Sequence, residues 1–466
     1  MTPTACTVLI VGSGPAGLFA ADHLRRAGVT NVVIVDKGKP MPSRFCPDNS
    51  SCECALCDVL EGEGGAGSFS DGKITLSAMR GTHAQRLFTS EQAALLAEVE
   101  ATIRKFVPEG MSYAPVSSMT ALEGHDDAGL RFESYPLLHV GSDGVRRFGQ
   151  RYSALLQEQG VTVMTGVEAR ELLITDGRAA GAVLYDSHAR LEWSIGCGFV
   201  VMAAGLIGTV WLEDQLRLAG VALGTGPADI GIRLETSAAA LGPFIDAFYD
   251  FKVEHTSPAG ITLRSFCVNG NGFVVNEYHR PLGIRGVNGH SFLDRKSGMS
   301  NLAILATIDQ AFTSDPKAYV REVAARVNSG AGGYPVHQTL AEFLPGASAP
   351  PLRITPSNPK TRPARLDQLL PAVLREAFAS FLRALGRVLP PVLASDSVIY
   401  APEIKYYNYR VPIDFGSWES TDISGLFVVG NAAGYTASLS AAALSGIIAA
   451  RAIAARAHLF PAECCR

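Results

Sequence analysis

The start of the chain alternates between apolar runs and a glycine-rich turn. Residues 6–11 are a short apolar run of strand-forming residues, residues 12–17 read GSGPAG, residues 18–27 have helical spacing, and residues 31–36 form a second apolar run. This order predicts a buried strand, a tight turn, a helix and a second buried strand, which together make a β-α-β unit.

A similar pattern returns further along the chain. A predicted helix at residues 149–159 is followed by predicted strands at 161–164 and 199–203, and the apolar run LFVVG at residues 426–430 precedes a helix of small residues that ends near residue 454. We therefore predict an α/β fold in which a Rossmann-like domain is interrupted by insertions.

These segments predict two domains, each built from separate stretches of the chain. The Rossmann-like domain takes residues 1–80, 140–215 and 400–466, and an α+β substrate or cap domain takes residues 81–139 and 216–399. The sequence contains no internal repeat, and no low-complexity linker is long enough to separate independently folding halves.

Composition narrows the partners of such a protein. The 466 residues carry 40 basic and 44 acidic side chains, a net charge of −4, so no excess positive charge is present to hold nucleic acid or an anionic membrane. The first residues have neither the basic region nor the cleavage site of a secretion signal, so we expect a cytoplasmic protein. The stretch 438–454 is rich in Ala and contains Arg451, which predicts a packed helix rather than a membrane span.

The glycine turn has the spacing of a dinucleotide-binding motif. Gly12, Gly14 and Gly17 lie where glycine allows a tight turn, a close approach to a pyrophosphate and close helix-to-strand packing. The N–H groups at the start of the helix favour phosphate. Asp36 ends the second predicted strand, where its carboxylate can accept hydrogen bonds from ribose hydroxyls. We therefore predict that this unit binds the ADP half of a dinucleotide.

Two other glycine patterns lack this context. Gly62, Gly64 and Gly67 have the same spacing but follow no predicted strand. Residues 67–73 resemble a phosphate-binding loop, but Ile74 stands where a metal-binding Ser or Thr is required. The sequence thus predicts a single dinucleotide fold, and an NAD(P)H co-substrate would have to bind without a Rossmann domain of its own.

Motifs along nearly the whole chain resemble those of the flavoproteins grouped as uncharacterised FAD-dependent dehydrogenases. The matching stretches include VLIVGSGPAGLFAADHL near the start, GGAGSFSDGK after a cysteine-rich loop, and APEIKYY and LFVVGNAAGY near the end. The resemblance implies FAD as the cofactor and a glutathione-reductase-type FAD-binding domain. It also implies, together with the glycine turn, a set of FAD-binding residues: Gly12, Gly14, Pro15, Ala16, Gly17, Asp36, Lys37, Gly65, Ala66, Gly67, Val167, Ala204, Gly205, Gly430, Asn431 and Ala442.

The last of these motifs departs from the family pattern. Asn431 stands where the family usually has Asp, so an amide replaces a negative charge near the phosphates but still hydrogen-bonds a ribitol hydroxyl. By the same resemblance, the helix that begins near Ser440 directs its positive N-terminus toward the pyrimidine edge of the flavin.

A cluster of cysteines follows the second predicted strand. Cys46, Cys52, Cys54 and Cys57 lie in a region where disulfide reductases of related fold carry redox cysteines. Their spacing matches no standard zinc-ribbon or ferredoxin run. Three interpretations stay open: ligation of a metal or an iron-sulfur cluster, a redox pair, and inert packing.

The middle of the chain supplies the candidate catalytic residues. Arg264 could bind a substrate carboxylate, His290 could move a proton, and Lys405 or Tyr406 could face the flavin ring. Each has a plain structural alternative, as a strand-edge charge, a loop histidine or a core residue. No Ser-His-Asp set, His-rich metal motif or telling carboxylate pair appears, which argues against a hydrolase.

Together these features predict an FAD-dependent dehydrogenase or oxidase that oxidises or desaturates a small organic substrate, with hydride passed to flavin N5. One alternative is a flavin reductase that uses NAD(P)H to reduce a C=C or C=N bond. An alternative of another class is an electron-transfer or redox-sensing flavoprotein that uses the cysteine cluster at residues 46–57.

Overall fold

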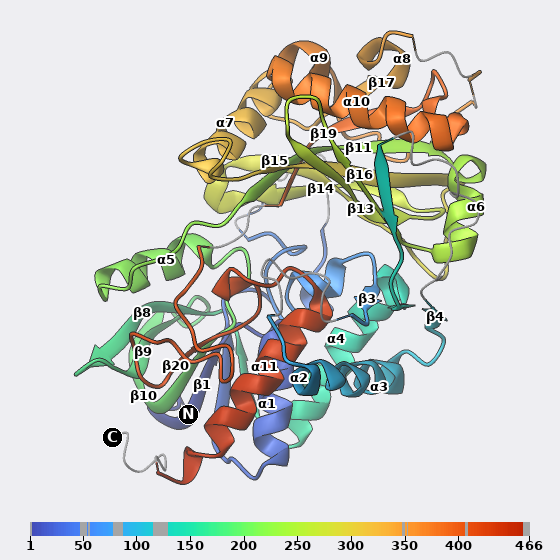
Figure 1. Cartoon of the computed structure of the whole chain (residues 1–466). Coiled ribbons are helices and arrows are strands. Elements are labelled where there is room, and N and C mark those ends of the chain that lie inside the picture. Colours follow the sequence, from blue (N-terminus) through green and yellow to red (C-terminus); the bar gives the residue numbers. More distant parts are fainter. Residues whose placement is uncertain are drawn as a thin grey trace.

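A computed structural model describes residues 2–46, 54, 56–77, 87–114, 129–346, 350–351, 353–405 and 409–459. The chain forms two units, one above the other in Figure 1, and each is built around its own sheet. The lower unit contains both the first and the last strand-helix pairs of the chain, which are blue and red in Figure 1.

The lower sheet is parallel at its centre. Its strands follow the order β7-β2-β1-β10, with β20 on the other side of β10, and all of these pairs are parallel. The strands are β1 (Ala5–Val11), β2 (Val32–Asp36), β7 (Thr162–Thr165), β10 (Leu191–Met202) and β20 (Leu426–Val428). Helices cover these strands, and their apolar runs are almost continuously buried, as expected of a parallel sheet.

β10 joins this parallel sheet to an antiparallel extension. Its first half, from Leu191 to Gly196, pairs with β9 (Arg178–Asp186), which in turn pairs with β8 (Val167–Thr175). Its second half pairs with β1 and β20. The burial pattern changes at the same point, from mainly exposed residues in the first half to continuously buried ones in the second.

Four longer helices support the lower sheet: α1 (Pro15–Arg26), α3 (Leu96–Phe106), α4 (Gly141–Glu158) and α11 (Leu439–Ala454). Small residues let α1 and α11 approach closely, because a Cβ on Gly446 would lie only 2.1 Å from the carbonyl oxygen of Ala16. This packing is the reason for the Ala-rich composition of α11. No helix in the described residues is both long and apolar enough to cross a membrane.

The upper unit is an eight-stranded sheet in the order β18-β17-β19-β11-β16-β13-β12-β5. It is antiparallel apart from the β17–β18 pair. Its strands are β5 (Leu130–Glu133), β11 (Ala228–Ser237), β12 (Lys252–Thr256), β13 (Thr262–Asn269), β16 (Met299–Ile308), β17 (Val336–Thr339), β18 (Arg362–Pro363) and β19 (Val398–Lys405). The helices of this unit are α6 (Ala238–Phe248), α7 (Pro316–Ser329), α8 (Leu340–Phe343), α9 (Leu366–Leu369) and α10 (Ala372–Val388).

Smaller elements complete the two units. They are the hairpin of β14 (Phe273–His279) and β15 (Ile284–His290), the sheet of β3 (Lys73–Thr75), β6 (Leu137–His139) and β4 (Met111–Tyr113), and the helices α2 (Ser90–Ala94) and α5 (Thr209–Leu218).

The predicted fold class is confirmed, since the lower unit is a Rossmann-like α/β domain and the upper unit combines an antiparallel sheet with helices. Two of the expected boundaries differ from these elements. Residue 400, where the Rossmann-like domain was expected to resume, lies inside β19 of the upper sheet. The segment 81–139 was expected in the cap, but Leu96, Val99 and Ile103 of α3 belong to the core of the lower unit. The apolar face of α3 needs a partner surface, and the lower unit provides it.

Candidate active site

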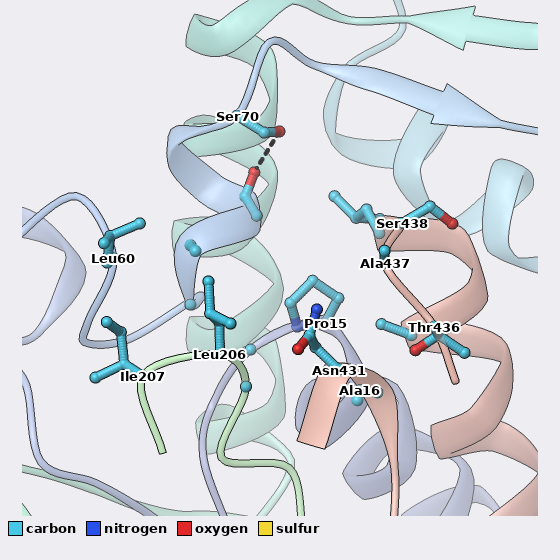
Figure 2. Close-up of a pocket in the computed structure, with 18 of the residues that line it drawn as sticks. Pro15, Ala16, Leu60, Ser70, Leu206, Ile207, Asn431, Thr436, Ala437 and Ser438 are labelled. Carbon is cyan, nitrogen blue, oxygen red and sulfur yellow. Dashed lines mark hydrogen bonds between the residues drawn. The ribbon is translucent and has the colours of Figure 1, made fainter. Parts of the chain in front are cut away.

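A cavity of about 640 Å³ lies between the two units and is lined by residues of both. Its floor comes from the turn after β1, the ends of β2 and β10, and the start of α11. Its roof comes from β12, β13 and β19 of the upper sheet. Figure 2 shows part of the floor, with Pro15 between Leu206 and Ile207 on one side and Thr436 to Ser438 on the other.

The three glycines of the first turn have different surroundings. A Cβ on Gly12 would lie 2.3 Å from the oxygen of Ala203, and a Cβ on Gly17 would lie 2.1 Å from the oxygen of Gly12. A Cβ on Gly14 would meet only the Cα of Gly65, at 3.7 Å, and Gly14 lines the cavity. Gly12 and Gly17 therefore allow the turn to form, whereas Gly14 leaves open space directly before the N-terminus of α1.

Asp36 lines the cavity at the end of β2 and also holds the glycine turn in place. Its Oδ2 accepts hydrogen bonds from the backbone N (3.0 Å) and Oγ (2.6 Å) of Ser13, and its Oδ1 accepts one from Gly38 N (2.9 Å). A carboxylate has about four acceptor sites, so one remains for a ligand. The bond to Ser13 is a structural role that the sequence analysis did not assign.

A buried arginine shapes the loop above the turn. The Arg44 guanidinium donates hydrogen bonds to the backbone carbonyls of Asp58, Val59, Gly62, Glu63 and Gly65. Burial lowers the pKa of Arg44 to about 10, so the side chain is still a cation at neutral pH. These bonds fix the backbone that leads to Gly65, Ala66 and Gly67, which line the cavity beside Pro15.

Near the start of α11, two polar atoms face the cavity without a partner. Asn431 Oδ1 and Thr436 Oγ1 are buried, and within the described part of the chain neither has a hydrogen-bond partner. Both residues line the cavity, as Figure 2 shows. Buried polar atoms are rarely left unpaired, so these two fit a ligand that carries hydroxyl groups.

Almost all of the predicted cofactor-binding residues meet at this one cavity. Those that line it are Gly12, Gly14, Pro15, Ala16, Asp36, Lys37, Gly65, Ala66, Gly67, Val167, Ala204, Gly205, Gly430, Asn431 and Ala442. Gly17 is not among the lining residues, because it packs against the backbone of the turn itself.

The predicted catalytic residues are more scattered. Arg264 and Lys405 line the roof of the cavity, and Arg264 forms an ion pair with Asp229. His290, at the end of β15, is not a lining residue, and burial lowers its pKa to about 4, so it is neutral at pH 7. Tyr406 lies outside the described residues.

Beside the roof lies a cluster of buried charges that the sequence analysis missed. Lys73 Nζ lies 3.0 Å from Asp71 Oδ2 and 3.8 Å from Asp250 Oδ2, and Asp250 Oδ2 accepts a hydrogen bond from Tyr135 Oη at 2.5 Å. Burial opposes ionisation of Asp71, but the Lys73 charge outweighs it and lowers the pKa of Asp71 to about 2. All four residues line the cavity. The available signal was the Asp-Gly-Lys end of GGAGSFSDGK, a stretch that the sequence analysis related to the family and to a phosphate-binding loop but not to buried charges.

The cysteine cluster is described only in part, because Cys52 lies outside the described residues. Among the residues with described positions, no group of three or more His, Cys, Asp or Glu side chains is placed to hold a metal ion. Burial raises the pKa of the Cys57 thiol, which disfavours the reactive thiolate form. Metal ligation and redox pairing stay predictions.

The site combines three features. The glycine turn lies between β1 and α1, Asp36 ends β2, and Asn431 and Thr436 direct polar atoms without partners in the described residues toward a long cavity. This combination is typical of a dinucleotide-binding fold. A family model described as "FAD binding domain" matches residues 7–253, and one described as "FAD-dependent protein, C-terminal domain-like" matches residues 242–405. The first match covers more than half of the chain, so this chain belongs to the FAD-binding-domain family. It is an FAD-dependent oxidoreductase, and the predicted cofactor FAD is confirmed at that level.

Individual relatives are distant. A Clostridium beijerinckii protein described as "Uncharacterized protein" is 24% identical over 472 residues, which cover 94% of this chain and 79% of that protein. The FAD complex of glycerol-3-phosphate dehydrogenase from Bacillus halodurans has a TM-score of 0.44 at 12% identity, and the match covers 98% of this chain but only 65% of that one. L-amino acid deaminase from Proteus myxofaciens, solved with anthranilate, has a TM-score of 0.42 at 13% identity, over 98% of this chain and 91% of that one.

Proposed function

We propose that the protein is a dehydrogenase or oxidase that oxidises or desaturates a small organic molecule, in the manner of the FAD-dependent dehydrogenases that its motifs resemble. The observation that carries this proposal is the continuous cavity of about 640 Å³ that runs from the glycine turn to the roof in the upper sheet. FAD, when bound, supplies a two-electron acceptor.

The residues of the floor fit FAD. Gly14 leaves room for a pyrophosphate before the N-terminus of α1, and Asp36 keeps an acceptor site for a ribose hydroxyl. Asn431 Oδ1 and Thr436 Oγ1 supply hydrogen-bonding atoms that suit the hydroxyls of a ribityl chain.

The residues of the roof would hold the substrate. Phe266 contributes an apolar surface, and Arg264, Lys252 and Lys405 contribute positive charge around it. Lys73, Asp71 and Tyr135 add groups that can donate or accept hydrogen bonds at the cavity surface. A pocket with mostly apolar walls and a few charged groups is typical of a small-molecule site.

Cofactor binding is tested first. Purified protein incubated with FAD is expected to stay yellow after desalting and to melt at a higher temperature than the untreated protein. A preparation that remains colourless and shows no thermal shift would contradict the proposal at its first step.

Anaerobic reduction then separates the alternatives. Bleaching of the flavin by an organic substrate, found by screening metabolite mixtures, supports the dehydrogenase or oxidase. Rapid bleaching by NADPH without substrate would instead support a reductase. If turnover with a metabolite is unchanged when Cys46, Cys52, Cys54 and Cys57 are all replaced by Ser, the electron-transfer alternative through the cysteine cluster is removed.

A further inference from the structure

We propose that the substrate is an organic acid whose carboxylate binds to a cationic wall in the roof of the cavity, formed by Lys252, Arg264, Phe266 and Lys405. This inference rests on the proposed function, since it names the class of substrate for the same cavity. It assigns roles to Lys252 and Phe266, and it joins Arg264 and Lys405, far apart in the sequence, into one binding surface.

The three cations of the wall gather around one aromatic ring. Lys252 Nζ lies 4.8 Å from the centroid of the Phe266 ring, and Arg264 Cζ and Lys405 Nζ each lie 5.4 Å from it. The residues come from β12, β13 and β19, and all four line the cavity. Each cation also has a carboxylate neighbour, Asp250, Asp229 and Glu403 respectively, so the wall would bind an anion through the donors that it presents to the cavity and not through an excess of positive charge.

Within the described residues, the ammonium groups of Lys252 and Lys405 have only long ion pairs. Lys252 Nζ lies 3.8 Å from Asp250 Oδ2, and Lys405 Nζ lies 3.4 Å from Glu403 Oε1 and 4.0 Å from Glu277 Oε1. An N–H···O hydrogen bond normally spans 2.7–3.2 Å, so both groups keep the capacity for closer partners. Burial lowers the pKa of Lys252, as expected of an ammonium whose counter-ion is not close.

The carboxylates near Lys405 are occupied by other donors. Glu403 accepts two bonds of 2.7 Å from Arg233, and Glu277 accepts bonds from His279 Nε2 (2.8 Å) and Asn288 Nδ2 (2.9 Å). Neither glutamate lines the cavity. On the cavity side, the wall therefore presents Lys405 rather than its counter-ions.

The Phe266 ring indicates which kind of anion the wall binds best. Because the cations surround the apolar face of Phe266, the wall suits an anion that also carries apolar atoms. An organic carboxylate meets both requirements, whereas inorganic phosphate offers charge alone.

Binding can be measured without turnover. FAD-loaded protein is titrated with benzoate, with the uncharged analogue benzamide and with inorganic phosphate, and the shift of the visible flavin band and the heat of binding are recorded. We expect benzoate to bind, benzamide to bind at least about tenfold more weakly because it lacks the charge, and phosphate to bind weakly or not at all.

Variants of the wall lysines test whether benzoate binds at the cationic wall. Lys252→Met and Lys405→Met keep a long apolar stem but remove the charge, and each is expected to weaken benzoate binding by about tenfold or more. Lys105→Met removes an exposed lysine of α3 that does not line the cavity, and it is expected to bind benzoate like the unmodified protein. Retention of the yellow colour shows that the variants are folded.

Three results would overturn the inference: no benzoate binding to the FAD-loaded protein, equal affinity for benzamide, or unchanged benzoate binding in both cavity variants. Tighter binding of phosphate than of benzoate would also reject an organic acid. These outcomes differ from failure of the proposed function. That failure would be seen as a protein that does not bind FAD, or as a bound flavin that no organic compound reduces.

Discussion

At the scale of single residues, the glycines of the first turn fall into two groups, according to whether an added Cβ would meet backbone atoms or open space. A Cβ on Gly12 would collide with the Ala203 carbonyl at 2.3 Å, whereas a Cβ on Gly14 would extend into the cavity. One motif thus contains glycines that the protein needs in order to fold and a glycine that the ligand needs in order to bind.

We predict that Gly14→Ala folds but binds FAD at least about 100-fold more weakly, because the methyl group occupies the space of the pyrophosphate. Gly12→Ala should lower the yield of folded protein, because its Cβ meets backbone and its φ of +106° is strained for any other residue. Thermal melts of the FAD-free proteins and fluorescence titration with FAD distinguish the two effects. Tight FAD binding by Gly14→Ala would show that the pyrophosphate does not approach this residue.

Arg44 shows how one buried side chain can organise a loop. Its five partners within the described residues are all backbone carbonyls, of which only those of Gly62 and Gly65 also accept a backbone N–H there, so removal of the guanidinium takes away several donors together. We predict that Arg44→Met loses several kcal/mol of stability, since each unsatisfied buried carbonyl costs about 1–3 kcal/mol. Urea denaturation measures the loss, and a difference from the unmodified protein below about 1 kcal/mol would contradict it. Arg147→Met, which removes a half-exposed arginine of α4, is the control.

Among elements, the contact between α1 and α11 closes the lower unit. The two helices belong to opposite ends of the sequence, and Gly446 lies where they touch. The Ala16 carbonyl leaves no room for a side chain at this contact. The small residues of α11 are therefore what allows the two helices to pack closely.

We predict that Gly446→Ala destabilises the protein by about 1–3 kcal/mol or more, because a Cβ 2.1 Å from the Ala16 oxygen forces the helices apart. Gly242→Ala in α6 is the matched control, since a Cβ there meets nothing within 4 Å beyond its chain neighbours. The control should stay within about 1 kcal/mol of the unmodified protein, because the preference of Ala for helix is offset by the contact of its Cβ with the ring of Pro243. Equal denaturation midpoints for the two variants would show that α1 and α11 can adjust.

At the scale of the whole molecule, the two units meet through buried polar groups as well as through the cavity. His139 of β6 is 1% exposed, and its Nε2 lies 2.6 Å from the Oη of Tyr249, which follows α6 of the upper unit. Burial lowers the pKa of His139 to about 3, so this contact contains a neutral imidazole.

This pKa predicts sensitivity to acid. In the unfolded chain His139 takes up a proton below about pH 6.5, whereas in the folded protein it stays neutral down to about pH 3. The unfolded state then binds more protons, so stability falls by about 1.4 kcal/mol per pH unit as the pH drops through this window. Urea denaturation of His139→Gln at pH 7 and pH 5 should show a smaller loss than the unmodified protein. His188→Gln, at an exposed position, should keep the full dependence.

The sequence by itself determined the local parts of this protein. The strand, glycine turn, helix and acid at the start were predictable, because each depends on neighbouring residues and on conformations that only glycine adopts easily. The small-residue character of α11 was also visible, and so was the family resemblance that identified the other glycine loops.

The tertiary structure alone decided the roof of the site. Lys252, on β12, carries no local signal that it faces a cavity. Lys405 on β19 was a candidate and Lys73 on β3 lies in GGAGSFSDGK, but neither segment shows that these side chains meet in one cavity. They converge because strands distant in sequence pair in an order that period-two patterns do not encode. The same holds for α3, assigned to the cap from its position in the chain but packed on the lower core. Amphipathic patterns show which face of an element is buried, whereas the partner of that face is chosen by the packing of the whole chain.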